Sequence, residues 1–177
     1  QDCSCCTSTR NHLMKILVTG ATGFIGNHLI CELLKSKSNQ IVATSRSIDK
    51  ARKSDWFSKV EYIKYNFNDG IGKDLFEFFG KPDQLIHLAW EGLSNYNSPS
   101  HMDVIFPNHC NFIESMIAGG LIDVVVTGTC FEYGMIEGRL SEDMEIKPEN
   151  PYAVAKDSLR RFIADLQNRH SFTYKWI

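Results

Sequence analysis

A tyrosine and a lysine four residues apart are the clearest candidates for chemistry in this sequence. Tyr152 and Lys156 lie at the start of a helix predicted over 151–168, where residues i and i+4 share one face. A nearby ammonium group stabilises a phenolate, so such a tyrosine can exchange a proton with a carbonyl or alcohol oxygen. Because such pairs also occur by chance on helix surfaces, a catalytic interpretation needs support from elsewhere in the chain.

A hydroxyl group that could assist the tyrosine follows the fifth predicted strand, 123–127. Thr129 lies just beyond this strand, and ligands of a doubly wound sheet bind at the carboxyl ends of its strands. Its hydroxyl could donate a hydrogen bond to the substrate oxygen that Tyr152 protonates. The alternative is a β-branched residue at a strand end that bonds only to the backbone.

Three glycines mark a candidate phosphate-binding turn. The segment Gly20-Ala21-Thr22-Gly23-Phe24-Ile25-Gly26 follows an apolar strand and opens an amphipathic helix, the context that a dinucleotide fingerprint requires. Gly20 permits the tight turn, Gly23 leaves room for a pyrophosphate, and Gly26 lets the helix pack close to the strand. The free N–H groups at the helix start attract phosphate. A glycine-rich turn without a ligand is the alternative.

The end of the second predicted strand, 40–45, bears on the choice of cofactor. A carboxylate there would bind the ribose hydroxyls of NAD, but the sequence continues Thr44-Ser45-Arg46 without an acid. A guanidinium group binds phosphate in a forked geometry. Arg46 therefore favours NADP, with NAD left open because Arg46 could simply be solvated.

Alternating strands and helices must position these residues. Strands are predicted at 15–19, 40–45, 60–67, 84–89, 123–127 and 171–177, and helices at 24–35, 75–79, 104–118 and 151–168, with 46–58 partly helical. In the third strand, Val60 and Tyr62 are expected on one face, and Ile63 and Tyr65 on the other. Apolar strands joined by helices indicate the α/β class, with a doubly wound, Rossmann-like parallel sheet in a three-layer αβα arrangement.

Composition excludes several classes of protein. The 177 residues are 43% hydrophobic and 23% charged, which suits one globular domain, and the net charge of −2 argues against a nucleic-acid partner. No apolar run reaches the roughly 20 residues of a membrane helix, and 1–11 is too polar for a secretory signal, so we expect a cytoplasmic protein. The cluster Cys3, Cys5 and Cys6 lacks partners at metal-binding spacing, so we expect no metal site.

The two ends of the sequence suggest where the domain lies. Met14 directly precedes the first strand, so 1–13 is predicted to be a disordered or non-native extension. The last predicted strand has no element after it, which indicates a fragment. We therefore expect an NAD(P)-binding domain over 14–177, with a C-terminal substrate-binding part missing.

These features together resemble the extended short-chain dehydrogenase/reductases, also called the NAD-dependent epimerase/dehydratase family. The matching motifs are GATGFIG at 20–26, HLA at 87–89, Thr129 four residues before Tyr133-Gly134, and YAVAK at 152–156. The resemblance implies that Tyr152 is the catalytic acid/base, that Lys156 binds the nicotinamide ribose and lowers the pKa of Tyr152, and that Thr129 supplies the hydroxyl. The cofactor-binding residues expected are Gly20, Thr22, Gly23, Phe24, Ile25, Gly26, Ser45, Arg46, Asn66, Phe67, Leu88, Ala89, Trp90, Tyr152 and Lys156.

Departures from the family pattern narrow the chemistry. The aspartate that often contacts adenine after the third strand is replaced by Asn66. Sugar 4,6-dehydratases carry acids directly after the catalytic threonine, but here Cys130 and Phe131 occupy those places, and Glu132 is expected to point elsewhere. A dehydratase is therefore disfavoured.

Two further stretches suggest a subfamily. TGTCFEYG at 127–134 and LAWEGL at 88–93 resemble bacterial reductases and epimerases of 4-keto-6-deoxy nucleotide sugars, such as the dTDP-4-dehydro-6-deoxyglucose reductases. The leading hypothesis is a reductase that passes hydride to a sugar C4 ketone. An epimerase that retains NAD is the near alternative, and a catalytically silent dinucleotide-binding or interaction module is the alternative of another class.

The resemblance also implies a possible homodimer. The helices 104–118 and 151–168 pair across the dimer interface in the family. Their apolar stripes could serve that purpose or could simply cover the sheet. These stripes consist of Phe112, Met116 and Ile117 on the first helix, and Leu159, Phe162, Ile163 and Leu166 on the second.

Overall fold

A six-stranded parallel sheet forms the centre of the computed structural model, which describes residues 13–70 and 74–177. Its order, β3-β2-β1-β4-β5-β6, reverses direction between β1 and β4, as a doubly wound sheet does. The strands are β1 (Met14–Thr19), β2 (Asn39–Ser45), β3 (Glu61–Lys64), β4 (Gln84–His87), β5 (Asp123–Val126) and β6 (Thr173–Trp176). The predicted Cys3, Cys5 and Cys6 cluster lies outside the described residues.

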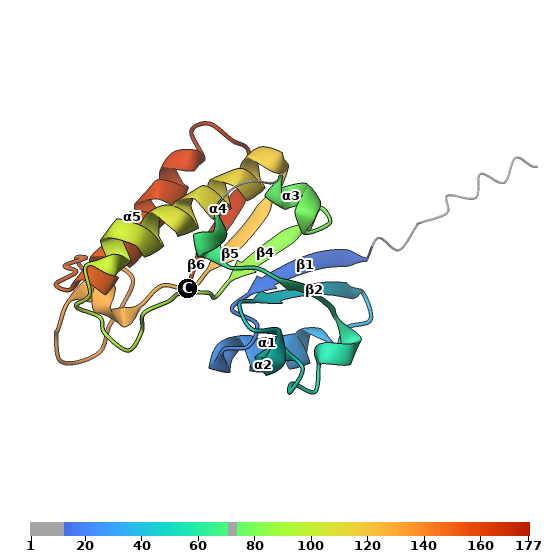
Figure 1. The fold of residues 1–177 in the computed structure, drawn as a ribbon. Coiled ribbons are helices and arrows are strands. Elements are labelled where there is room, and N and C mark those ends of the chain that lie inside the picture. Colours follow the sequence, from blue (N-terminus) through green and yellow to red (C-terminus); the bar gives the residue numbers. More distant parts are fainter. Residues whose placement is uncertain (1–12, 71–73) are drawn as a thin grey trace, which may run out of the picture.

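Helices cover both faces of this sheet, which confirms the three-layer αβα class (Figure 1). One face carries α1 (Phe24–Leu33) and α2 (Ile48–Ala51), and the other carries α3 (Leu75–Phe78), α4 (Phe106–Gly119) and α5 (Pro151–Leu166). Each face has its own apolar cluster: Ile16, Ile30 and Trp56 are buried under α1 and α2, and Leu17 and Phe112 under the longer helices. The burial of both faces explains why the strand sequences are apolar without strict alternation.

The third strand behaves as its sequence predicts, although its paired part is short. Val60 and Tyr62 pack toward the cluster beneath α1, whereas Ile63 and Tyr65 pack toward the cluster beneath α4. Strand β3 pairs with β2 only from Glu61 to Lys64, and the β2 residue opposite Lys64 is Ser45. The predicted strand 60–67 was therefore too long, because a 3₁₀ turn replaces the ladder beyond it.

The helix predicted at 104–118 starts differently from its prediction. A π-helical turn, His101–Ile105, leads into α4, and Pro107 lies in the first turn of α4. Proline is tolerated there because the first N–H groups of a helix have no partner within the helix. The predicted loop 130–150 likewise begins with a 3₁₀ turn, Cys130–Tyr133.

Most of the apolar stripes on α4 and α5 face the core of this chain. Phe112, Met116 and Ile117 are buried, as are Leu159 and Ile163, so these residues cover the sheet. Pairing of the two helices in a homodimer stays a prediction. In the part of the chain that the structure describes, none of the helices could cross a membrane, and no cluster of three metal-ligating side chains occurs.

Candidate functional site

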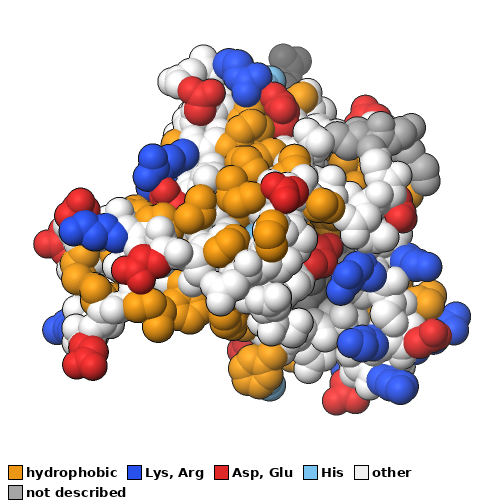
Figure 2. Space-filling model, turned by 60° about the vertical axis from the view of Figure 1, so that its left-hand side comes forward, with side chains coloured by type: hydrophobic (Ala, Val, Ile, Leu, Met, Phe, Trp, Pro, Cys, Tyr) orange, Lys and Arg blue, Asp and Glu red, His pale blue; other side chains and the backbone are white. Residues whose placement is uncertain are grey.

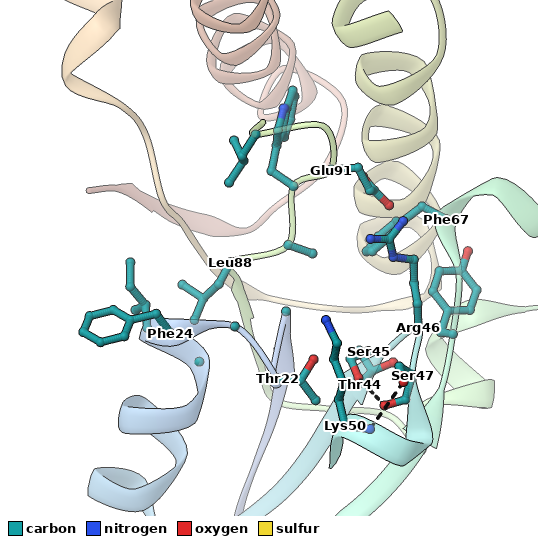
Figure 3. Close-up of a pocket in the computed structure, with 18 residues that line it drawn as sticks. Thr22, Phe24, Thr44, Ser45, Arg46, Ser47, Lys50, Phe67, Leu88 and Glu91 are labelled. Carbon is teal, nitrogen blue, oxygen red and sulfur yellow. Dashed lines mark hydrogen bonds between the residues drawn. The ribbon is translucent and has the colours of Figure 1, made fainter. Parts of the chain in front are cut away.

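A cavity of about 480 Å³ opens at the carboxyl ends of β1, β2 and β4, where the sheet order reverses (Figure 3). Its size lies within the range of small-molecule sites. Twelve of the predicted cofactor residues line it: Gly20, Thr22, Gly23, Phe24, Ile25, Gly26, Ser45, Arg46, Phe67, Leu88, Ala89 and Trp90. Six other residues line it that sequence reasoning missed, namely Thr44, Ser47, Lys50, Tyr65, Glu91 and Leu93.

Close backbone packing explains the glycine turn. Gly20 has φ +68°, and a Cβ atom there would lie 2.9 Å from the Ala89 nitrogen. At Gly26 a Cβ atom would lie 2.3 Å from the Gly20 carbonyl oxygen, far inside van der Waals contact. A side chain at either position would displace the turn, so the glycines hold the start of α1 against the strand ends and leave its N–H groups facing the cavity.

The β2 side of the cavity is cationic, with Arg46 and Lys50 in its lining. Ser47 caps the short helix α2 by accepting the Lys50 N–H at 3.3 Å. The Ser45 hydroxyl bonds to the Tyr62 hydroxyl at 2.9 Å. The end of β2 thus presents hydroxyl groups and cations, of which Ser45 and Arg46 are predicted from the sequence.

Asn66 does not line the cavity. Its side chain caps the following 3₁₀ turn by accepting the Asn68 N–H at 3.3 Å, and it donates to Asp69 at 3.0 Å. Its neighbour Phe67 turns inward and lines the cavity. The structure therefore places Phe67 in the cavity lining and Asn66 outside it.

The predicted catalytic residues Tyr152 and Thr129 come together beside this cavity. The Thr129 hydroxyl lies within hydrogen-bonding reach of the Tyr152 phenol and acts to lower its pKa. Burial is the larger effect, so the pKa of Tyr152 is raised above its ordinary value, with Tyr96 and Glu132 adding to the rise. The expected lowering of this pKa by Lys156 is not seen.

Lys156 is enclosed by aromatic rings. Its side chain is 2% exposed, and its ammonium nitrogen lies 4.7 Å from the ring centre of Trp90 and 5.1 Å from that of Trp176. Burial lowers the pKa of Lys156 to about 8, although the Glu132 carboxylate acts in the opposite direction. Cation–π contact with the two indoles stabilises the charged form in this apolar setting.

Glu132 lies next to Thr129, and its carboxylate bonds to the backbone of that residue and does not line the cavity. It is 4% exposed, and its Oε1 atom accepts the Thr129 backbone N–H at 2.8 Å. The Trp176 indole N–H donates to its Oε2 atom at 3.0 Å. The T-x-x-E spacing of a capping box, which Thr129 and Glu132 form, was the available signal.

Trp90 lies between the cavity and the predicted catalytic residues. It lines the cavity, its ring centre lies 6.0 Å from that of Tyr152, and it contacts the Lys156 ammonium. The predicted cofactor residues Tyr152 and Lys156 are therefore absent from the cavity lining but lie directly behind Trp90. A ligand extending from the glycine turn past Trp90 would reach the tyrosine.

Exposed apolar side chains occur in the loops that follow β4 and β5. Leu93 and Tyr96 follow β4, Met135 and Ile136 follow β5, and all four are exposed. Figure 2 shows hydrophobic side chains gathered across one face of the molecule.

A doubly wound sheet with a glycine turn at its first strand and a tyrosine–lysine pair beside the resulting cavity defines a class of dinucleotide-dependent proteins. The sequence model of the NAD dependent epimerase/dehydratase family matches residues 16–177. The chain belongs to this family.

Similar proteins include several enzymes of nucleotide sugars. The chain is 30% identical to dTDP-6-deoxy-L-talose 4-dehydrogenase (NAD(+)) of Aggregatibacter actinomycetemcomitans, a match that covers 86% of this chain and 55% of the relative. It is 27% identical to a UDP-glucose 4-epimerase of Pisum sativum, a match that covers 86% of this chain and 47% of that relative. The chain thus spans about half the length of the curated relatives it matches.

Solved structures show the same fold. UDP-glucuronic acid 4-epimerase from Bacillus cereus, in complex with UDP-glucuronic acid and NAD, superimposes with a TM-score of 0.76 at 24% identity, over 92% of this chain and 55% of the other. MoeE5 in complex with UDP-glucose and NAD superimposes with a TM-score of 0.70 at 26% identity, over 92% of this chain and 52% of the other.

Proposed function

We propose that this chain is the dinucleotide-binding part of a reductase that acts on the C4 ketone of a 4-keto-6-deoxy nucleotide sugar. The observation that carries the proposal is the meeting of Thr129, Tyr152 and Lys156 behind a cavity built on the glycine turn. The similarity to a dTDP-sugar 4-dehydrogenase supports chemistry at C4 of a nucleotide sugar.

The cavity lining suits NADP or NAD. A side chain at Gly20 or Gly26 would collide with the backbone and displace the turn, whose free N–H groups would bind the pyrophosphate. Arg46 and Lys50 would hold a 2′-phosphate, which favours NADP. NAD is the alternative, because the family is described as NAD dependent. The bound cofactor supplies hydride.

Tyr152 would act as the proton donor. Its raised pKa keeps the phenol protonated at neutral pH, the state needed to protonate a ketone oxygen as negative charge develops there. Thr129 would hydrogen-bond the same oxygen and orient it. Lys156, charged below about pH 8, would provide positive charge beside the developing alkoxide and bind the cofactor ribose.

Substitution of the tyrosine tests this mechanism. Tyr152→Phe removes the proton donor but keeps the ring, so we expect turnover of a 4-keto-6-deoxy nucleotide sugar to fall by roughly a hundredfold or more, with NADPH affinity little changed. Tyr174→Phe, which alters a tyrosine of β6 packed against the core, should retain turnover. Wild-type turnover in Tyr152→Phe would refute the mechanism.

Two other functions give different results in the same experiments. An epimerase, which the similarity to the Pisum sativum enzyme favours, would retain NAD through purification and interconvert epimers without added cofactor. A catalytically silent module would bind dinucleotide in a titration without any turnover.

A further inference from the structure

A chain of buried hydrogen bonds runs beneath the cavity and ends on a carboxylate in its lining. The Thr19 hydroxyl bonds to His87 Nδ1 at 3.0 Å, His87 Nε2 to His109 Nδ1 at 2.7 Å, and His109 Nε2 to Glu91 at 3.0 Å. Thr19, His87 and His109 are fully buried, whereas the Glu91 side chain is 14% exposed. We call these four residues the relay.

The direction of each hydrogen bond in the relay follows from its first residue. The Thr19 oxygen accepts the N–H groups of Leu88 and Ala89 at 3.2 and 3.3 Å, so its proton is free to be donated to His87 Nδ1. His87 then carries its proton on Nε2 and donates to His109 Nδ1, and His109 in turn donates from Nε2. Glu91 can therefore act as a carboxylate acceptor while both imidazoles stay neutral.

Aromatic packing keeps the end of the relay in place. The His109 ring lies between Phe67, stacked at 4.4 Å, and Trp90, at 4.7 Å, and both of these residues line the cavity. Burial lowers the pKa of His109 and also tends to raise that of Glu91, but the hydrogen bond from His109 and the positive charge of Arg46 leave the pKa of Glu91 below its ordinary value. The carboxylate is thus held ionised and fixed in direction.

The Glu91 carboxylate faces Arg46, the cation that would bind a 2′-phosphate. Glu91 and Arg46 point toward one another on the same side of the cavity (Figure 3), and Glu91 is the one carboxylate among the described lining residues. NADP differs from NAD by a phosphate of about two negative charges, so an ionised carboxylate here repels NADP more strongly than NAD. Arg46 would favour binding of NADP over NAD, whereas Glu91 would favour NAD over NADP.

We propose that Glu91 is a specificity-determining residue of the dinucleotide cavity. The relay fixes its carboxylate opposite Arg46, and this negative charge lowers the preference of the cavity for a 2′-phosphate. The inference rests on the proposed function, since it assumes that the cavity binds NAD(P). It explains how a chain with a cation after β2 can belong to a family described as NAD dependent.

Titration of the 177-residue chain with NADH and NADPH tests the inference, with energy transfer from tryptophan to the nicotinamide as the signal, because Trp90 lines the cavity. Glu91→Gln keeps an oxygen that can accept from His109 and removes the charge, so the variant should fold. We expect the ratio of NADPH to NADH affinity to rise by about fivefold or more, with NADH affinity changed far less. Glu61→Gln, at the opposite end of β3 from the cavity, changes the net charge equally and should leave the ratio unchanged.

The possible results separate the inference from the proposed function. If the wild-type chain binds either dinucleotide and Glu91→Gln leaves the ratio within twofold of the wild-type value, the inference is wrong and the proposed function stands. If Glu61→Gln moves the ratio as much as Glu91→Gln does, net charge and not the relay sets the preference, which also overturns the inference. If the wild-type chain binds neither dinucleotide, the proposed function fails and the inference fails with it.

Discussion

Replacing the buried lysine of the site should stabilise the fold at neutral pH. Lys156 is 2% exposed, and burial lowers its pKa from 10.5 to about 8. At roughly 1.4 kcal/mol for each tenfold change in the acidity constant, holding the ammonium in this site costs about 3 kcal/mol at pH 7. Lys156→Met removes that cost and keeps an unbranched side chain between the two tryptophans.

The net gain is smaller than this cost because favourable contacts are also lost. The ammonium lies 4.7 and 5.1 Å from the centres of the Trp90 and Trp176 rings, and a desolvated cation–π contact contributes up to about 2 kcal/mol. Methionine recovers part of this through contact between its sulfur and the rings. We therefore expect Lys156→Met to raise the free energy of unfolding by about 1–3 kcal/mol at pH 7.

The pH dependence of the gain identifies its cause. Below pH 8 the lysine is charged in both the folded and the unfolded chain, so the full cost is present. Between pH 8 and 10.5 the folded protein loses this proton first, so the wild-type chain gains stability relative to the variant, and the difference vanishes above pH 10.5.

Urea unfolding followed by circular dichroism at pH 7, 8, 9 and 10 measures this difference. Lys175→Met, at an exposed position of β6, serves as the control and should show no comparable trend. A variant that is less stable than the wild-type chain at pH 7, or a gain that is the same at pH 7 and pH 10, would refute the reasoning.

Two other substitutions test the backbone and the surface. Gly26→Ala places a Cβ atom 2.3 Å from the Gly20 carbonyl oxygen. Urea unfolding should therefore show a free energy of unfolding that is lower by about 1–3 kcal/mol or more, and dinucleotide binding should be lost. A variant with unchanged stability and binding would contradict the packing argument. Arg169→Ala removes the ion pair between Arg169 and Glu114, whose side chains are 51% and 37% exposed, respectively. The free energy of unfolding should therefore change by less than about 1 kcal/mol.

The local part of the fold could be predicted from the sequence because its signals lie within a few residues of one another. The glycine turn, the apolar strand before it and the amphipathic helix after it are contiguous, and the structure confirms all three. The boundaries were less accurate where tertiary contacts decide them. The third predicted strand stops at Lys64 because its partner β2 ends at Ser45.

The parts of the site that escaped prediction depend on contacts between distant residues. His87 meets His109 across 22 residues and Glu132 meets Trp176 across 44. Each of these residues has an ordinary local context, so only the assembled sheet and helices bring their polar atoms together. The pKa of Tyr152 was misjudged for the same reason, because burial of the phenol raises it by more than the hydrogen bond from Thr129 lowers it.

The contact between Trp176 and Glu132 gives a reason for the glycine next to Thr129, the proposed catalytic threonine. A Cβ atom on Gly128 would lie 2.4 Å from the Trp176 indole nitrogen and 2.9 Å from a Glu132 carboxylate oxygen. That carboxylate accepts the Thr129 N–H and so sets the direction in which the Thr129 side chain leaves the backbone. Because Trp176 belongs to β6, the pairing of β6 with β5 is coupled to the orientation of Thr129. Strand β6 is therefore part of the contacts that orient the proposed catalytic threonine as well as part of the sheet.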